Sequence, residues 1–138
     1  MPSQRISGLA VSDGATAEVE RGLFEGNHEV GVSASRTDSD LRLTDVTIRN
    51  TLPQESDGRS GTGLQVQEGA RAEVSRCTVE LSSGIGVTAF SSVTVLTVTD
   101  LVVRDNAGRG MNVQEGPQVA ATRAVFERNR GIGVLAAA

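Results

Sequence analysis

The sequence predicts an all-β solenoid, a parallel β-helix of about six coils with roughly 23 residues and three short strands in each coil. Three observations lead to this prediction. A glycine followed by an apolar residue recurs at a nearly constant interval, short runs of alternating apolar and polar residues lie between these glycines, and similar residues fall into columns when the repeats are aligned.

The recurring glycine marks the start of each coil. It stands at Gly8, Gly31, Gly63, Gly86, Gly110 and Gly133, with spacings of 23, 32, 23, 24 and 23 residues. This period is too short for a helical-hairpin repeat, and no unit holds a helix-periodic run long enough for a helix. The one long interval contains residues 52–59, which we interpret as an inserted turn outside the repeat. The whole chain, 1–138, is therefore expected to form a single domain.

Aligning the coils produces apolar columns that we expect to point inward. In a solenoid, residues at equivalent positions stack about 4.8 Å apart from coil to coil. The first column is Leu9, Val32, Leu64, Val87, Met111 and Val134, and the second is Val11, Ala34, Val66, Ala89, Val113 and Ala136. The third is Phe24, Ile48, Val79, Val103 and Phe126, flanked by Gly22, Val46, Cys77, Leu101 and Ala124.

Polar and charged residues form columns as well, and we interpret these as structural ladders. One column is Asn27, Thr51, Ser82, Asn106 and Asn129, whose side chains can hydrogen-bond between coils at a turn. Two others alternate in sign: Arg21, Asp45, Arg76, Asp100 and Arg123, and then Glu25, Arg49, Glu80, Arg104 and Glu127. Opposite charges on neighbouring strands attract and like charges repel, so this alternation favours one stacking register.

These repeats, from Ile6 to Ala136, resemble the parallel β-helix repeats of the pectate-lyase-like superfamily, shared by pectate lyases, polygalacturonases and phage tailspikes. The resemblance, together with the preference of parallel crossovers for one hand, implies a right-handed coil. It also favours an extracellular or cell-surface location in a bacterium. It implies a fold and no particular activity.

The amino-acid composition limits the classes of binding partner that we expect. The net charge of −4 and the pI near 5.0 do not favour binding to nucleic acid. No apolar run approaches the length of a membrane span, and the first six residues are too polar for a signal peptide. Cys77 is the single cysteine, which we expect to behave as a small apolar residue.

The activities that the resemblance raises need residues that do not come together in this sequence. Polygalacturonase-like enzymes use clustered aspartates with a histidine, whereas the single histidine here, His28, lies in a turn. Pectate-lyase-like enzymes hold Ca²⁺ with several carboxylates. Asp13, Glu68 and Glu115 share a column, but carboxylates in alternate coils lie roughly 9.6 Å apart, too far to share one cation. We therefore predict no catalytic residue, no metal site and no cofactor.

One outward strip of polar residues is a candidate for ligand contact. Its members are Ser33, Gln65, Thr88 and Asn112, on the strands that follow the repeating glycine. A polysaccharide is the ligand that such a strip would suit, although the chain lacks Trp and Tyr for stacking on sugar rings.

The expected function is a non-catalytic solenoid module with a structural or recognition role in a bacterial surface or secreted protein. The alternative is a fragment of a polysaccharide lyase or glycoside hydrolase whose catalytic coils lie outside this chain. The first and sixth coils begin and end abruptly, which predicts self-association through open coil ends, with a two-fold dimer favoured.

Overall fold

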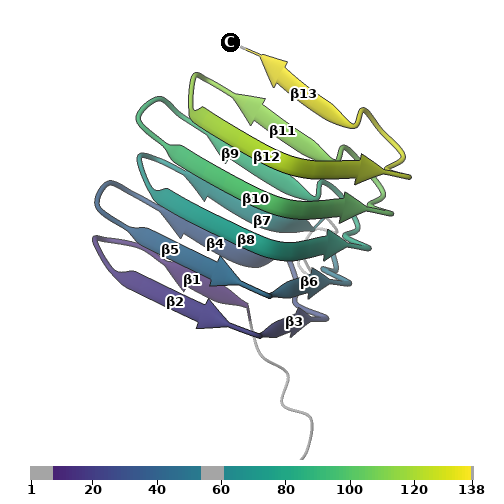
Figure 1. Ribbon diagram of the computed structural model, residues 1–138, viewed down its shortest axis with the longest axis horizontal. Coiled ribbons are helices and arrows are strands. Elements are labelled where there is room, and N and C mark those ends of the chain that lie inside the picture. The colour runs from purple at the N-terminus through teal and green to yellow at the C-terminus, as the bar shows by residue number, and fades with distance from the viewer. Residues whose placement is uncertain (1–7, 54–60, 138) are drawn as a thin grey trace, which may run out of the picture.

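The computed structural model describes residues 8–53 and 61–137, and within these ranges the regular structure consists entirely of β-strands in two parallel sheets (Figure 1). The six-stranded sheet has the order β1 (Leu9–Val11), β4 (Val30–Ser35), β7 (Thr62–Gln67), β9 (Val87–Phe90), β11 (Met111–Gln114) and β13 (Val134–Ala137). The seven-stranded sheet contains β12 (Gln118–Glu127), β10 (Val95–Arg104), β8 (Arg71–Glu80), β5 (Asp40–Thr44) and β2 (Thr16–Glu20) in that order, with β3 (Leu23–Glu25) and β6 (Thr47–Arg49) pairing beside them.

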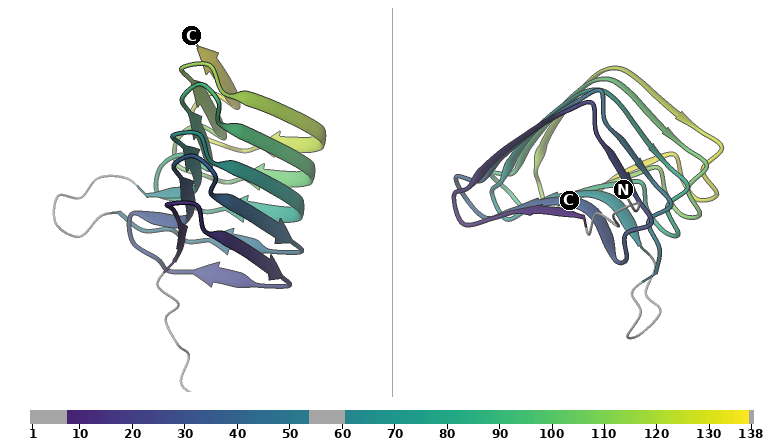
Figure 2. Two further views of the ribbon diagram at one scale, coloured as in Figure 1. Left: turned by 90° about the vertical axis from the view of Figure 1, so that its left-hand side faces the viewer. Right: turned by 90° about the horizontal axis from the view of Figure 1, so that it is seen from below.

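Each of the five complete coils contributes one strand to the six-stranded sheet and one or two strands to the other, and seen along the stack the coils superpose in a roughly triangular outline (Figure 2). The described residues make five complete coils, and β13 begins a sixth. Three strands per coil, as predicted, occur in the first two coils. In the next three, the second and third strands merge into the ten-residue strands β8, β10 and β12, because the ladder continues around the bend between them.

The register confirms the predicted apolar columns. Leu9 pairs with Val32, Val32 with Leu64 and Leu64 with Val87, and the same column continues through Met111 to Val134. On the other sheet Phe24 pairs with Ile48, and the column continues through Val79 and Val103 to Phe126. One repeat of the sequence therefore corresponds to one coil, after which the chain has returned to the equivalent position in the sheet.

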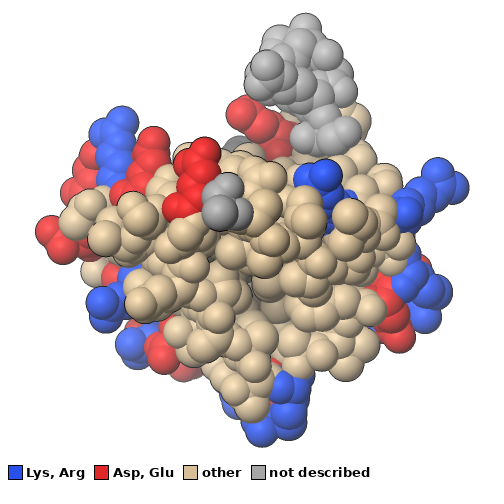
Figure 3. All heavy atoms as spheres, turned by 90° about the horizontal axis from the view of Figure 1, so that it is seen from above, with Lys and Arg blue, Asp and Glu red and all other residues tan. Residues whose placement is uncertain are grey.

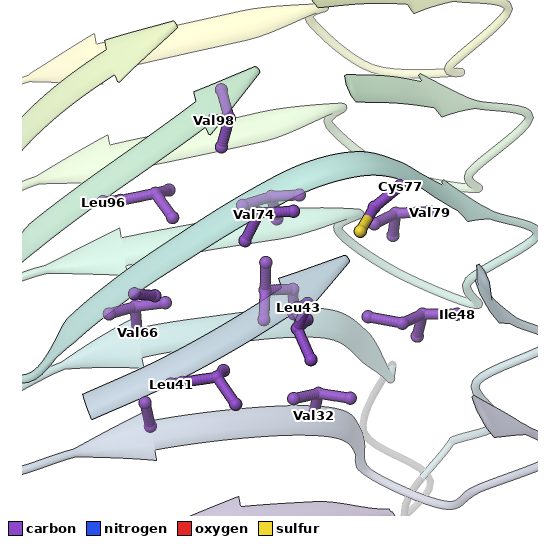
Figure 4. Packing of buried hydrophobic residues seen from close by; sticks show 14 of the residues in the cluster. Val32, Leu41, Leu43, Ile48, Val66, Val74, Cys77, Val79, Leu96 and Val98 are labelled. Carbon is purple, nitrogen blue, oxygen red and sulfur yellow. The ribbon is translucent and has the colours of Figure 1, made fainter. Parts of the chain in front are cut away.

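The core is a narrow stack of aliphatic side chains between the two sheets (Figure 4). On β5, for example, Leu41 and Leu43 are fully buried and Arg42 between them is exposed, as the alternation of a strand requires. Burying a Val or Leu side chain contributes about 1.5–3 kcal/mol each. Cys77 is 2% exposed and its Sγ donates to the carbonyl of Ser75, so it packs as a small core residue.

The repeating glycine is explained by close approach to the core. A Cβ atom on Gly63 would lie 2.5 Å from Cγ1 of Val79 and 2.8 Å from the carbonyl oxygen of Gly86. Gly31 and Gly86 meet Ile48 and Val103 in the same way. In these three coils a side chain would therefore collide with the column that begins at Phe24, whereas at Gly8 and Gly110 it would collide with the backbone of the next coil.

All three corners of the coil contain left-handed residues, and at the corner after the first strand these include Asp13, Arg36, Glu68, Ser91 and Glu115. The alternating-charge column that begins at Arg21 has φ between 51° and 57° throughout, and it forms the bend between the second and third strands. A second left-handed column, Gly26, Asn50, Leu81, Asp105 and Arg128, immediately precedes the asparagine column. The inserted turn predicted for 52–59 is described only at Leu52 and Pro53, and the rest lies outside the described residues.

Candidate functional site

Most of the charged side chains in the predicted ladders pair between neighbouring coils. Arg76 donates to both carboxylate oxygens of Asp45, and Arg123 donates to both oxygens of Asp100, at 2.6 and 3.0 Å. In the second ladder Arg49 donates to Glu25 at 3.0 Å and Arg104 to Glu80 at 2.9 Å. Each of these four acids thus pairs with the arginine of the following coil, whereas Glu127 in the last complete coil pairs with its neighbour Arg128.

The two ladders join alternate coil interfaces. The pairs Glu25–Arg49 and Glu80–Arg104 join the first coil to the second and the third to the fourth. The pairs Asp45–Arg76 and Asp100–Arg123 join the second coil to the third and the fourth to the fifth. Every interface between complete coils therefore contains one ion pair from these two ladders.

The ion pairs keep the carboxylates ionised. Hydrogen bonds from Arg76, Arg123 and Arg128 lower the pKa values of Asp45, Asp100 and Asp105, respectively, below the ordinary range of an aspartate. A carboxylate with a lowered pKa is a poor proton donor near neutral pH. These aspartates are thus held as ionised partners of arginine in the stack.

The asparagine column hydrogen-bonds along the stack. Asn106 is 1% exposed, its Oδ1 accepts from the backbone N–H of Ser82, and its own N–H and Nδ2 donate to Oδ1 of Asn129. In the first coil, Oδ1 of Asn27 accepts from the N–H of Gly8 at 2.7 Å. These side chains satisfy backbone groups at the corner where the chain turns from one sheet to the other.

The acidic column considered for calcium is divided by an arginine. Asp13 accepts a hydrogen bond from Arg36 of the second coil, whereas Glu68 and Glu115 belong to later coils. His28 lies with Nδ1 2.9 Å from the carbonyl oxygen of Pro53. Among residues 8–53 and 61–137, no group of three or more His, Cys, Asp or Glu side chains is placed to hold a metal ion.

The six-stranded sheet differs from the other sheet in charge. None of its strands, which read LAV, VGVSAS, TGLQVQ, VTAF, MNVQ and VLAA, contains a charged residue. Charged side chains are concentrated on the seven-stranded sheet and at the corners. Figure 3 shows them gathered at the rim when the solenoid is viewed from the end at which β13 lies. The outer face of the six-stranded sheet is therefore the uncharged face of the molecule.

All four predicted ligand-contact residues lie in one column on this uncharged face. The register pairs Ser33 with Gln65, Gln65 with Thr88 and Thr88 with Asn112. Ser33 and Gln65 are partly exposed, whereas Thr88 and Asn112 are each 3% exposed. The strip is thus more enclosed in the fourth and fifth coils than the alternation of the strands suggests. In the fifth coil, Arg109 Nη1 donates to Asn112 Oδ1 at 3.3 Å.

The next outward column contains residues that sequence reasoning missed. Phe90 follows Ala89 of the core column, lies outside the hydrophobic core, and is partly exposed. Gln114 is its register partner in the fifth coil, and Gln67 holds the equivalent place in the third coil, one residue beyond the paired Val66 and Ala89. The signal was available, because Phe90 stands two residues after Thr88 in an alternating strand.

A recess of about 420 Å³ lies at the corner where the chain passes from the six-stranded sheet to the seven-stranded sheet, between the turns of the second and fourth coils. The intervening turn, from Gln67 to Arg71, is one residue shorter than its neighbours and contains Gly69. Asp38, Asp40 and Arg71 line this recess with charges of both signs. It therefore contrasts with the uncharged face.

Fold and ladders together define a β-solenoid whose coils are joined by ion pairs and asparagine side chains. The family model described as the right-handed β-helix region matches residues 7–138, so the chain belongs to this family and its coil is right-handed. No curated protein and no solved structure matches the chain. Within the described residues, no helix is long and apolar enough to cross a membrane.

Proposed function

We propose that this chain is a non-catalytic β-solenoid module that acts as a stiff scaffold and presents a surface for recognition in a bacterial surface or secreted protein. The observation that carries the proposal is how its charged groups are used. Four of the five acids of the ladders are paired with arginines of the next coil, and two of them, Asp45 and Asp100, have lowered pKa values.

The arrangement of these pairs supports a scaffold role. An exposed ion pair adds little stability alone, but pairs at every coil interface favour one register along the whole stack. The ladder residues also offer few side chains that could act in catalysis. General acid–base catalysis needs a proton donor and an acceptor on one substrate, and the ladder acids point to their own arginines instead.

An activity assay tests this proposal against the alternative of a lyase or hydrolase. The 138-residue chain is incubated with polygalacturonate and Ca²⁺, and separately with neutral polysaccharides, and unsaturated products and reducing ends are measured. We expect neither product above a heat-denatured control. Turnover that is lost in Asp13→Ala or Glu68→Ala would overturn the proposal, because it would show that the acidic column is catalytic.

A further inference from the structure

A strip of uncharged side chains runs along the third side of the solenoid, on β3, β6 and the last parts of β8, β10 and β12 (Figure 1). Leu23 and Val125 at its two ends are 42% and 46% exposed, and the side chains between them are partly exposed. Its members, which pair in register from coil to coil, are Leu23, Thr47, Thr78, Val102 and Val125. The ladder that begins at Arg21, here called the bend ladder, borders the strip on one side and the second ladder borders it on the other. The strip and the two ladders together form what we call the third face.

Every complete coil has opposite charges at the two borders of the third face. In the first coil, Arg21 stands two residues before the strip and Glu25 two residues after it. In the second coil the order is reversed, with Asp45 before the strip and Arg49 after it. The order alternates in this way through all five complete coils. The third face thus has a chequered pattern of charge on either side of an uncharged centre line.

This pattern is complementary to itself under one rotation. A two-fold axis that runs along the stack, over the strip, places the bend ladder of one copy opposite the second ladder of the other at the same coil. Arg21 then faces Glu25 of the second copy, and Asp45 faces Arg49 of the second copy. The three remaining coils follow the same rule, so every ladder position meets an opposite charge. Each strip residue meets its own equivalent, and Leu23 packs on Leu23.

Other arrangements of two copies are disfavoured by the same pattern. With the stacks antiparallel and fully overlapping, the first coil lies over the fifth, so Arg21 faces Arg123 and Asp45 faces Asp100. A shift by one coil makes this antiparallel arrangement attractive but leaves one coil of each copy uncovered. The same shift in the parallel arrangement sets like charges against each other throughout. Because like charges at an interface disfavour association, the parallel arrangement in register is the one that the face supports best.

The ladder side chains remain accessible after they pair within their own stack. Arg76 and Asp45, for example, are bonded to each other and are still 59% and 42% exposed. Arg21 is exposed and has no ion pair among the described residues. A guanidinium group has five N–H donors, so an arginine bonded within its stack can also donate to a carboxylate of a facing copy. The ladders can therefore serve the stack and a contact between copies together.

We propose that the third face packs against the third face of a second copy, with the two stacks side by side and parallel. From a coil spacing of about 4.8 Å and a rise of about 3.3 Å per residue, the face covers about 300 Å² per copy. A stable complex buries about 800 Å² per partner. The contact is therefore weak, and it forms where copies are concentrated, as on a surface that displays many of them. It goes beyond the proposed scaffold function, because it lets one scaffold recognise another.

Cross-linking of single cysteines tests the contact. Val125→Cys places a thiol on the third face, and Ala120→Cys is the control, with an exposed thiol on β12 before the bend. Both chains also carry Val134→Arg, which removes pairing through the exposed end of the stack, and Cys77 is too buried to react. At about 0.5 mM protein, a short bismaleimide should link Val125→Cys about tenfold faster than the control, because paired copies hold equivalent thiols together. Equal rates would overturn the proposal and leave the face to a partner other than a second copy.

The direction of the two stacks is tested with a second cysteine at the other end of the strip. In the parallel arrangement Leu23→Cys and Val125→Cys each link to their own kind, since each residue faces its equivalent. A mixture of the two variants should then give few mixed dimers. Mixed dimers that form faster than either homodimer would overturn the proposal, because they would show that the stacks are antiparallel.

A charge exchange separates contact between copies from stability of the stack. Arg21→Glu should slow the linking of Val125→Cys about threefold, because the new carboxylate faces Glu25 of the second copy. Adding Glu25→Arg should restore the rate, since the charges between copies are opposite again. Within one stack, the same two changes set like charges beside the acid and the arginine of the second coil, so a purely structural role of the ladders predicts no restoration. Rates are divided by those of Ala120→Cys with the same changes, which corrects for net charge. A double variant that links as slowly as Arg21→Glu alone would overturn the proposal.

Discussion

The carboxylate of Asp45 accepts two hydrogen bonds from Arg76, a residue 31 positions later in the chain, at 2.9 and 3.1 Å. Both residues have positive φ and both stand at the bend of their coil. A left-handed arginine is unusual, since residues with a Cβ disfavour this region and only Gly, Asn and Asp enter it readily. The pair therefore links the conformation of the corner to the register of the stack.

Reversing one charge of this ladder should reduce stability in a salt-dependent way. Asp100→Arg would place three guanidinium groups in successive coils, beside Arg76 and Arg123. We expect the melting temperature to fall by about 2–4 °C at low salt and by less at high salt, because exposed charges are screened. Thermal unfolding followed by circular dichroism measures this, with Asp100→Asn as the neutral control. A salt-independent melting temperature would contradict the structural role of the ladder.

The lowered pKa values of Asp45, Asp100 and Asp105 predict how stability depends on pH. A carboxyl group whose folded-state pKa is below its unfolded value stabilises the fold above the unfolded pKa, near 3.9, and loses that contribution as the pH falls through the folded value. Wild type should thus be more stable than the triple Asp→Asn variant between about pH 5 and 8. The difference should vanish in strong acid. An equal difference at pH 7 and pH 2 would contradict this account.

Removing the side chain of Asn106 should be much more damaging than removing an outward polar group. Asn106→Ala leaves the Ser82 N–H without its acceptor and removes one of the two donors to Asn129 Oδ1, in a buried place. Losing these bonds should cost about 2–4 kcal/mol of unfolding free energy. Urea denaturation measures it, and Thr99→Ala on the outer face of β10 is the control. A cost equal to that of the control would show that the asparagine column is dispensable.

The glycine that starts the third coil, Gly63, should be intolerant of any side chain. For Gly63→Ala we expect a loss of about 2 kcal/mol or more, because the new methyl group meets Val79 and a backbone oxygen. Gly116→Asn is the matched comparison, since Gly116 has φ of 83° and open space around it, and asparagine tolerates that conformation. It should cost less than about 1 kcal/mol. The ranking fails if both variants unfold at the same urea concentration.

The 138-residue chain should associate at micromolar concentration. In the described residues β12 pairs on one side only, and Val134 is 46% exposed beside it. An open strand edge with apolar side chains favours pairing with a second copy. Sedimentation velocity should show a dimer, and Val134→Arg should shift it to monomer while Val93→Arg, at the exposed corner, does not. A 14.3 kDa monomer for the unmodified chain would contradict the expectation.

The fold was predictable because its constraints repeat. Leu9, Val32 and Leu64 have to stack, and the interval between them can be read directly. The candidate surface was harder to predict, since alternation says which way a side chain points but not how far its neighbours cover it. Thr88 and Asn112 were assigned to an open strip, but each is 3% exposed. The bend at Arg76 was also hidden, because arginine gives no turn signal.

The ion pairs between coils alternate between two corners from one interface to the next. This alternation limits how the number of coils can change. Deleting a single coil from the middle would bring like charges together at both corners. Loss of the second or fourth coil would set arginine against arginine at the bend and glutamate against glutamate at the other corner, and loss of the third would set aspartate against aspartate and arginine against arginine. Deleting or duplicating two adjacent coils would leave both corners with their original neighbours. Internal gains and losses of sequence should therefore be tolerated in even numbers of coils and selected against in odd numbers.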